Sequence, residues 1–150
     1  MTDETKQQKQ IPAIVMNSQY VKDLSLEIPH APQVFKKAVN TRPDVNLEVD
    51  VKTEKLEDNH YNVSLNFRIN GNLEGEPLFI LELSYAGIAT INVPQEHIEP
   101  VLMIEIPRLL FPFARSIITN NLVDAGLPPF MINPIDFVGL YQRRKTANLN

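Results

Sequence analysis

The sequence predicts an α+β fold: a four-stranded antiparallel sheet with two C-terminal helices packed on one face. Three observations support this fold class. Runs of alternating apolar and polar residues lie between residues 20 and 69, and a longer apolar run covers residues 78–91. Short polar connections separate these runs, which is typical of antiparallel strands. Beyond residue 99 the apolar spacing becomes helical, and strands followed by helices indicate an α+β domain.

The first two strands are predicted from a two-residue period. Tyr20, Lys22, Leu24, Leu26 and Ile28 share one side of the first strand, and Val21, Asp23, Ser25 and Glu27 share the other. Pro29 and Pro32 end this strand and open a loop that extends to about Pro43. Residues 45–51 then alternate valine or leucine with polar residues, as expected for a strand with one face in water.

Two further strands follow a Glu-Asp-Asn turn. Residues 61–69 alternate apolar and polar side chains, Asn70 with Gly71 predicts the next turn, and Gly75, Glu76 and Pro77 extend it. Residues 78–91 form the fourth strand, which has little internal polarity. Gly87 inside it indicates a bulge.

The long helical segment is predicted to be interrupted by proline. Its period begins near Glu99 or Leu102. Pro107 and Pro112 are expected to kink or restart the helix, because proline has no N–H to donate. The uninterrupted part of the helix covers residues 113–125.

A second helix is predicted after a proline-rich connection. Gly126 stands just past the first helix, where glycine is favoured. Asn133 is expected to cap the second helix, with Pro134 in its first turn and Asp136 three residues past the cap.

The 150 residues suit one domain. Residues 1–10 are expected to be a disordered N-terminal segment, residues 11–146 the folded domain, and residues 147–150 a short C-terminal tail. The polar first ten residues predict no signal peptide, and no apolar run is long enough for a transmembrane helix.

The composition excludes several kinds of site. The formal net charge of −4 argues against a nucleic-acid partner, which requires a basic face. The chain has no cysteine, so disulfides and thiolate metal sites are excluded. His30, His60 and His97 form no metal-binding motif. No acidic pair has a histidine or lysine placed to assist it, so the sequence predicts neither catalytic residues nor a metal site.

One sheet face is a candidate protein contact. Asp23 and Glu27 lie four residues apart on a strand, so both point the same way, about 13 Å apart. On the fourth strand, Ile80 and Glu82 share one side, opposite a row of apolar residues. Together the four residues could form an acidic face with an apolar centre, suited to a basic partner. An ordinary solvated sheet face remains the alternative at this point.

Exposed aromatic residues are the second candidate. Phe35 lies in the loop after the first strand, and Phe111, Phe113 and Phe130 flank the long helix. These residues can belong to the core or to an interface between copies of the chain, which is more common than a ligand groove.

Four motifs point to a known family. They are Tyr-Val-Lys-Asp-Leu-Ser-Leu-Glu at residues 20–27, Ala-Pro-Gln-Val-Phe at 31–35, Phe-Ile-Leu-Glu at 79–82, and the stretch 110–137, from Leu-Phe-Pro-Phe-Ala-Arg to Asn-Pro-Ile-Asp-Phe. The last is the most specific, because its order of Pro, Arg, Gly and Asn-Pro is improbable by chance. Over about residues 11–146 the chain resembles SecB, the bacterial protein-export chaperone.

The resemblance implies a function and an assembly. It implies a cytoplasmic holdase that binds unfolded precursor proteins, keeps them competent for translocation and delivers them to the SecA ATPase. It also implies a homotetramer, a dimer of dimers, with no ATP or other cofactor of its own. Neither nucleic-acid binding nor direct membrane insertion is expected.

The resemblance also implies roles for individual residues. The SecA-binding residues would be Asp23, Glu27, Ile80 and Glu82. The client-binding residues would be Phe35, Val39, Phe79, Phe130 and Phe137. The subunit interfaces would use Tyr20, Lys22 and Leu24 on the first strand, and Phe113, Ile117 and Asn121 on the long helix.

The chain departs from the family pattern at two places. Many members carry a tryptophan where this chain has Val39. Many also have a long acidic C-terminal tail with a second SecA contact, whereas this chain ends in Lys-Thr-Ala-Asn-Leu-Asn. Either that contact is missing here, or the basic residues Arg143, Arg144 and Lys145 replace it.

Two alternatives stay open on sequence alone. The first is a SecB-like chaperone dedicated to a single partner, such as an antitoxin. The second is a small-ligand or lipid-binding α+β domain, or an enzyme, that uses the gap between helices and sheet. A closed pocket with convergent polar groups would favour the second.

Overall fold

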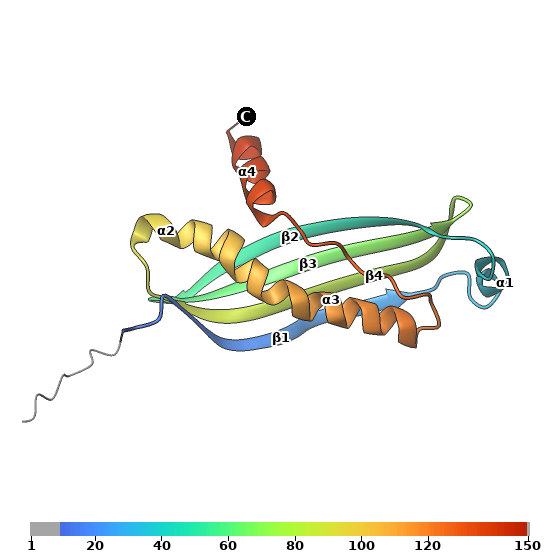
Figure 1. The fold of residues 1–150 in the computed structure, drawn as a ribbon, viewed down its shortest axis with the longest axis horizontal. Helices are drawn as coiled ribbons and strands as arrows, with labels where there is room; N and C mark the ends of the chain where they lie inside the picture. Colours follow the sequence, from blue (N-terminus) through green and yellow to red (C-terminus); the bar gives the residue numbers. More distant parts are fainter. Residues whose placement is uncertain (1–9, 150) are drawn as a thin grey trace, which may run out of the picture.

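The structure is a computed structural model that describes residues 10–149 (Figure 1). The predicted disordered segment therefore lies outside the described residues, except for Gln10. In chain order the elements are β1 (Ile14–Glu27), α1 (Val34–Ala38), β2 (Asp44–Glu57), β3 (His60–Leu73), β4 (Glu76–Ile91), α2 (Gln95–Pro100), η1 (Val101–Glu105), α3 (Ile106–Asp124) and α4 (Phe137–Asn148).

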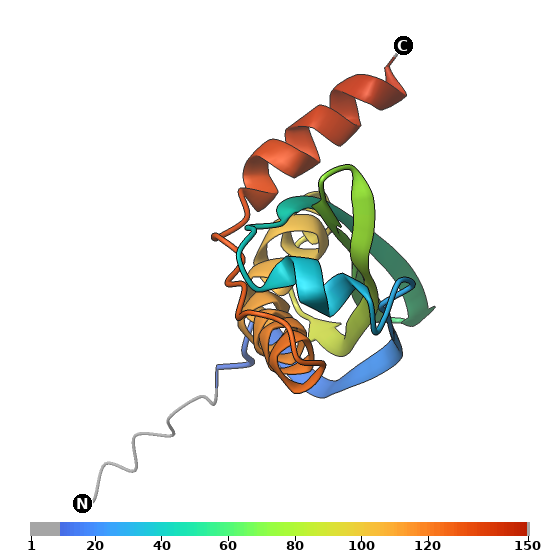
Figure 2. The ribbon, with the colours of Figure 1, turned by 90° about the vertical axis from the view of Figure 1, so that its right-hand side faces the viewer.

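The four strands form one antiparallel sheet with the order β1-β4-β3-β2. Helix α3 lies along one face, which we call the helix face, and the opposite face is the outer face (Figures 1 and 2). Helix α4 leaves this layer and projects past the edge strand β2 in both views. The predicted α+β class, with four antiparallel strands followed by helices, is confirmed.

The core lies between the helix face and α3. Helix α3 buries one residue per turn, and each of these five side chains is 0% exposed: Ile106, Leu110, Ala114, Ile118 and Leu122. They pack on the inward residues of β3 and β4: Val63, Leu65, Phe67, Ile69, Phe79, Leu81, Leu83 and Tyr85. Burying one such leucine or isoleucine contributes about 1.5–3 kcal/mol, so this seam dominates stability. The apolar row of β4 from Phe79 to Tyr85 is thus its buried side.

Strand β1 begins earlier than predicted and contains two irregularities. It starts at Ile14, and its register with β4 shifts between Met16 and Ser18 and again between Val21 and Asp23. A bulge adds one residue to one strand, so the side chains beyond it change sides. Tyr20 lies opposite Ala86 on the outer face, whereas Leu24 lies opposite Leu83 on the helix face. The predicted shared side for Tyr20 and Leu24 is therefore wrong.

The predicted start of the next turn at Asn70 and Gly71 is also wrong, although the turn does include Gly75 as predicted. Both residues are paired within β3, and the turn is formed by Glu74 and Gly75, with φ of 49° and 81°. Positive φ at both central residues matches the twist of a two-residue hairpin turn. Gly71 serves packing instead, because the ring of Phe79 occupies the space that its Cβ would fill.

Gly87 does not mark a bulge, contrary to the sequence interpretation. Its pairing with Gln19 and Val63 lies in regular stretches of both ladders. A Cβ at Gly87 would lie 2.6 Å from Cε of Met16 and 3.0 Å from Cδ2 of Leu110. The glycine therefore allows α3 to approach the sheet closely.

The long helical segment starts at Gln95 and continues to Asp124 without a non-helical residue. Its middle part, η1, is a π-helix in which the N–H of Ile106 donates to the carbonyl of Val101, five residues back. This wider turn stands directly before Pro107 and accommodates its ring and its missing donor. Pro112 lies inside α3 with an exposed side chain. The predicted restarts at both prolines are wrong, although the ribbon bends between α2 and α3 (Figure 1).

The end of α3 follows the prediction. Gly126 has φ of 85°, its N–H donates to Val123, and the N–H of Leu127 donates to Leu122. These two bonds satisfy carbonyls that the last helical turn leaves free.

Helix α4 starts later than predicted. Its cap is Asp136, whose Oδ1 accepts a hydrogen bond of 3.0 Å from the N–H of Gly139. Asn133 and Pro134 stay in the connection before it, so the predicted cap at Asn133 is wrong. The helix runs to Asn148 and includes the start of the predicted tail, residues 147–150.

The loop predicted after β1 contains the short helix α1. Its Val34 is 4% exposed and anchors the segment in the core. The sequence interpretation missed this helix because two prolines precede it and only five residues form it.

We expect Gly71→Ala to lower the free energy of unfolding by about 1–3 kcal/mol, because the new methyl group would overlap the ring of Phe79. Adding Phe79→Leu removes the ring, so the double variant should lose less than the sum of the two single losses. Urea denaturation measures both effects. An unchanged midpoint in Gly71→Ala would show that this contact is not tight.

Candidate protein-binding surfaces

The four residues of the predicted acidic face share the outer face of the sheet. Asp23 lies opposite Ser84, and Glu27 lies opposite Ile80. Glu82 lies opposite Ser25, which stands between Asp23 and Glu27 on β1. The three carboxylates are exposed and Ile80 is half-buried. We keep the name acidic face for Asp23, Glu27, Ile80 and Glu82.

The acidic face continues toward β2 in an open hollow of about 410 Å³. Asp23 and Glu82 line one side of it, and Glu48 and Asp50 of β2 line the other. Arg68 of β3 lies between them, and its Nη1 is 3.5 Å from Oε1 of Glu82.

Sequence reasoning did not include Glu48, Asp50 or Arg68 in the acidic face. Their alternation placed them on the polar sides of their strands. Their position beside Glu82 depends on the strand order, on the hairpin turn at residues 74–75 and on the register shift between Gly71 and Asn72. The turn alone would place Arg68 opposite Leu81, and the shift brings it opposite Glu82.

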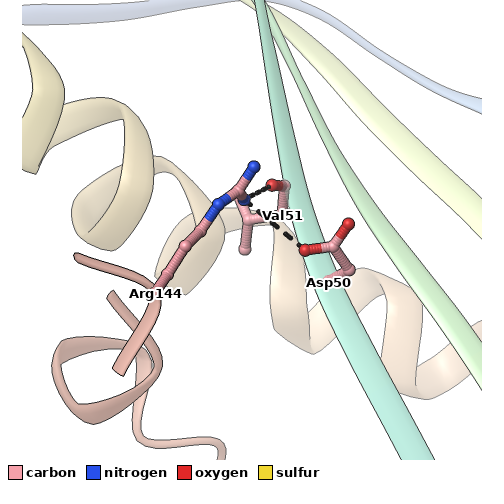
Figure 3. Close-up of polar contacts among 3 residues, drawn as sticks. All are labelled: Asp50, Val51 and Arg144. Atoms are coloured by element: carbon pink, nitrogen blue, oxygen red, sulfur yellow. Dashed lines mark hydrogen bonds and ion pairs between the residues drawn. The ribbon is translucent and has the colours of Figure 1, made fainter. Parts of the chain in front are cut away.

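A single arginine ties α4 to the edge strand β2. The Nη1 of Arg144 donates to the carbonyl of Val51 and lies 3.5 Å from Oδ1 of Asp50 (Figure 3). The guanidinium therefore reaches both a backbone acceptor of the open edge and a carboxylate of the hollow. This contact limits how Arg144 could serve any other partner.

An apolar cavity of about 530 Å³ lies beside the chain that follows α3, and it is lined by two of the predicted client residues. Phe79 and Phe130 both line it, together with residues 42–45 and residues 127–129. Thr119 of α3 donates a hydrogen bond of 3.1 Å to the carbonyl of Phe130, which fixes that segment against the helix.

The other three predicted client residues lie elsewhere. Phe35 of α1 is half-buried near the end of α3, where a Cβ at Gly126 would lie 3.8 Å from its ring. Val39 is 77% exposed after α1. Phe137 is 2% exposed and packs edge-to-face on Phe111, with ring centroids 6.2 Å apart. Phe137 is therefore a core residue of this chain.

The predicted interface residues of β1 lie on an edge strand. Among residues 10–149, β1 pairs only with β4, so its other edge is open. Leu24 is 37% exposed on the helix face, beside exposed Val21. Tyr20 points to the outer face, where its hydroxyl donates a 2.7 Å hydrogen bond to Asn62. Lys22 lies at the second register shift and is exposed.

Helix α3 presents an apolar stripe to solvent. Phe113 is 53% exposed, and Leu109 and Val123 are 45% and 49% exposed. The predicted residues Ile117 and Asn121 lie along one margin of this stripe and are half-buried. Asn121 donates to the carbonyl of Ile117 in its own helix. Sequence reasoning missed Leu109 and Val123, which their helical spacing from Phe113 could have indicated.

No helix in residues 10–149 is long and apolar enough to cross a membrane. Over the same residues, no three His, Asp or Glu side chains gather so that they could hold a metal ion.

The fold and its surfaces define an α+β protein that offers an acidic sheet face, an apolar cavity and an apolar helix stripe, the kind of surfaces used for protein contacts. The family profile described as "Preprotein translocase subunit SecB" matches residues 6–148. The chain belongs to the SecB family of protein-export chaperones and is not an enzyme.

Curated relatives support the same membership over nearly the whole chain. The protein-export protein SecB of Paramagnetospirillum magneticum is 47% identical over 150 residues, covering 100% of this chain and 96% of the relative. SecB of Rhodospirillum rubrum is 46% identical over 149 residues, covering 98% of this chain and 92% of the relative. The chain is accordingly a chaperone of protein export, and the ligand-binding and enzyme alternatives are not favoured.

A solved structure shares the fold at low sequence identity. The SecB-like chaperone of Mycobacterium tuberculosis, in complex with a peptide from an antitoxin, matches with a TM-score of 0.66 and 10% identity. The match covers 83% of this chain and 88% of the other. It extends the fold assignment to a distant protein.

We expect Arg144→Ala to loosen α4, because it removes the contact with Val51 and Asp50. Amide hydrogen exchange in residues 137–148 should accelerate, with a loss of about 1–2 kcal/mol in unfolding free energy. Arg143→Ala is the matched control, since it removes the same charge from the adjacent position. Equal exchange in the two variants would contradict the role of Arg144.

Proposed function

We propose that the chain acts in the cytoplasm as a homotetrameric holdase that keeps precursor proteins unfolded and delivers them to the SecA translocation ATPase. The observation that supports this most directly is the separation of two different surfaces on one rigid sheet. The acidic face lies on the outer face of the sheet, and the apolar cavity lies between the end of the sheet and the chain after α3. A chaperone that delivers a client to a second protein needs one surface for the client and another for that second protein.

The apolar cavity suits an unfolded client. Most of its lining is proline, leucine, valine and phenylalanine from three separate segments, and Arg42 and Asp44 add charge at one side. Such a surface accepts many sequences, because it offers apolar contact without a demanding polar pattern. A protein that binds unfolded chains in preference to folded ones shifts the client toward the unfolded state.

The client site would extend from the cavity toward α1. Phe35 lies near the end of α3, and exposed Val39 follows α1. Because Val39 stands where many family members have tryptophan, this part of the surface offers less aromatic area. Phe137, although proposed from the resemblance, is buried on Phe111 and could contact a client only after α4 moved.

The acidic face suits a basic surface on SecA. Exposed carboxylates attract a basic partner over about 10 Å at moderate ionic strength and lose that attraction as salt rises. Half-buried Ile80 offers an apolar contact between them.

The tetramer is supported by two unpartnered features of the chain. The open edge of β1 could pair with its copy across a two-fold axis, and the stripe of Leu109, Phe113 and Val123 could pack between two such dimers. Several client sites on one particle would raise the effective affinity for a long chain by about 10²–10⁴-fold.

Replacing Asp23, Glu27 and Glu82 together with alanine should weaken SecA binding by about tenfold or more at low salt. All three are exposed, so the unfolding free energy should change little. The matched control replaces Glu57, Glu96 and Glu99, which are exposed, carry the same total charge and lie outside the acidic face. Isothermal titration gives the affinities, and equal affinity for both triple variants would reject the acidic face as the contact.

Light scattering should give a mass near four times 17.1 kDa for the purified chain. Phe113→Asp should reduce that mass, because it places a charge in the apolar stripe. Leu56→Asp, which changes an exposed leucine of β2 outside the stripe, should leave the mass unchanged. A stable monomer of the unmodified chain would contradict the tetramer.

A further inference from the structure

Arg68 stands at the centre of the hollow beside the acidic face. In the sheet register it lies directly between Glu82 on β4 and Glu48 on β2. Four carboxylates line the hollow, those of Asp23, Glu48, Asp50 and Glu82, and within residues 10–149 Arg68 is the one cation that lines it. This places a basic side chain of the chain itself where a basic residue of a partner would bind.

The ion pair between Arg68 and Glu82 is of a kind that opens readily. Its nitrogen and oxygen are 3.5 Å apart, and the two side chains are 54% and 48% exposed. Pairs this exposed contribute only about 0–1 kcal/mol, because water and salt screen both charges. Arg68 can therefore swing away from Glu82 at little cost.

Glu82 does not depend on Arg68 for its position. Its backbone is paired on both sides, with Ser25 of β1 and with Arg68 of β3. Strand alternation alone directs its side chain to the outer face. Removing the guanidinium would thus leave the carboxylate in place and unneutralised.

The other carboxylates of the hollow have different surroundings. Asp50 is already within 3.5 Å of Arg144 at the edge of the sheet. Asp23 and Glu48 have no ion pair within residues 10–149. Glu82 is therefore the member of the acidic face whose charge an internal cation neutralises.

We propose that Arg68 is a built-in competitor for Glu82, which a basic residue of the partner must displace. Arg68 thereby lowers the affinity of the acidic face and favours partners that present enough positive charge to replace it. The inference rests on the proposed function, in which that partner is the SecA ATPase. It adds a residue that lowers the affinity for the partner, whereas the carboxylates raise it.

Arg68→Gln should bind SecA about two- to fivefold more tightly than the unmodified chain at about 0.02 M ionic strength. The gain should shrink toward none at about 0.5 M, where the Debye length falls to a few ångströms. Arg108→Gln is a closely matched control. Arg108 pairs with Glu105 at 3.1 Å, with side chains 52% and 50% exposed, and it lies on α3 away from the outer face.

A double-mutant cycle separates local competition from general charge. In a chain that carries Glu82→Gln, adding Arg68→Gln should give little or no further gain, because the competed carboxylate is absent. Light scattering on each variant should give the mass of the unmodified chain.

The outcomes distinguish the inference from the proposed function. If the acidic triple variant loses SecA binding while Arg68→Gln binds equally or more weakly, the competitor role is wrong and the acidic face stands. An equal gain in Arg108→Gln would also overturn it, since the effect would then be net charge. If the unmodified chain does not bind SecA, the proposed function fails and the inference fails with it.

Discussion

The packing of a single helix on a four-stranded sheet determines how the rest of the molecule is arranged. Helix α3 places five fully buried side chains, one per turn, on the inward residues of β3 and β4. Because strand side chains alternate, the residues between those inward positions point to the outer face. The outer face is polar as a consequence, and its charges occupy fixed positions on paired backbone. A surface built this way is rigid, which suits a contact that recognises the pattern of charge more than its exact fit.

The same packing separates the surfaces of the chaperone. The apolar cavity forms where α3 ends and the chain passes Phe79, so it shares Phe79 with the core seam and takes its other walls from residues 42–45 and 127–130. The acidic face lies across the sheet from that seam. Changes in surface charge on the outer face can therefore alter partner binding without a change in the cavity, and the two functions of a carrier can evolve separately.

Sequence reasoning was most successful where the two-residue period is uninterrupted. It placed Asp23 with Glu27 and Ile80 with Glu82, because no register shift lies inside either pair. It failed at Tyr20, because the shift after Val21 leaves no mark in an alternating pattern of residue types. It missed Arg68 as a neighbour of Glu82, because cross-strand neighbours depend on the turn and on the register shift between Gly71 and Asn72, which has no sequence signal. Arg144 could not be assigned, since its partner lies 93 residues away in sequence.

The irregular edges of the sheet bear on self-aggregation. A protein that handles unfolded chains meets segments that readily add to any flat, unpaired strand. In this chain one edge, β1, is bent by two register shifts and exposes Lys22 at the second. The other edge, β2, carries alternating charges and has the carbonyl of Val51 taken by Arg144. The register shifts of β1, and the charges of β2 with Arg144, therefore disfavour the addition of an unfolded client strand to either edge.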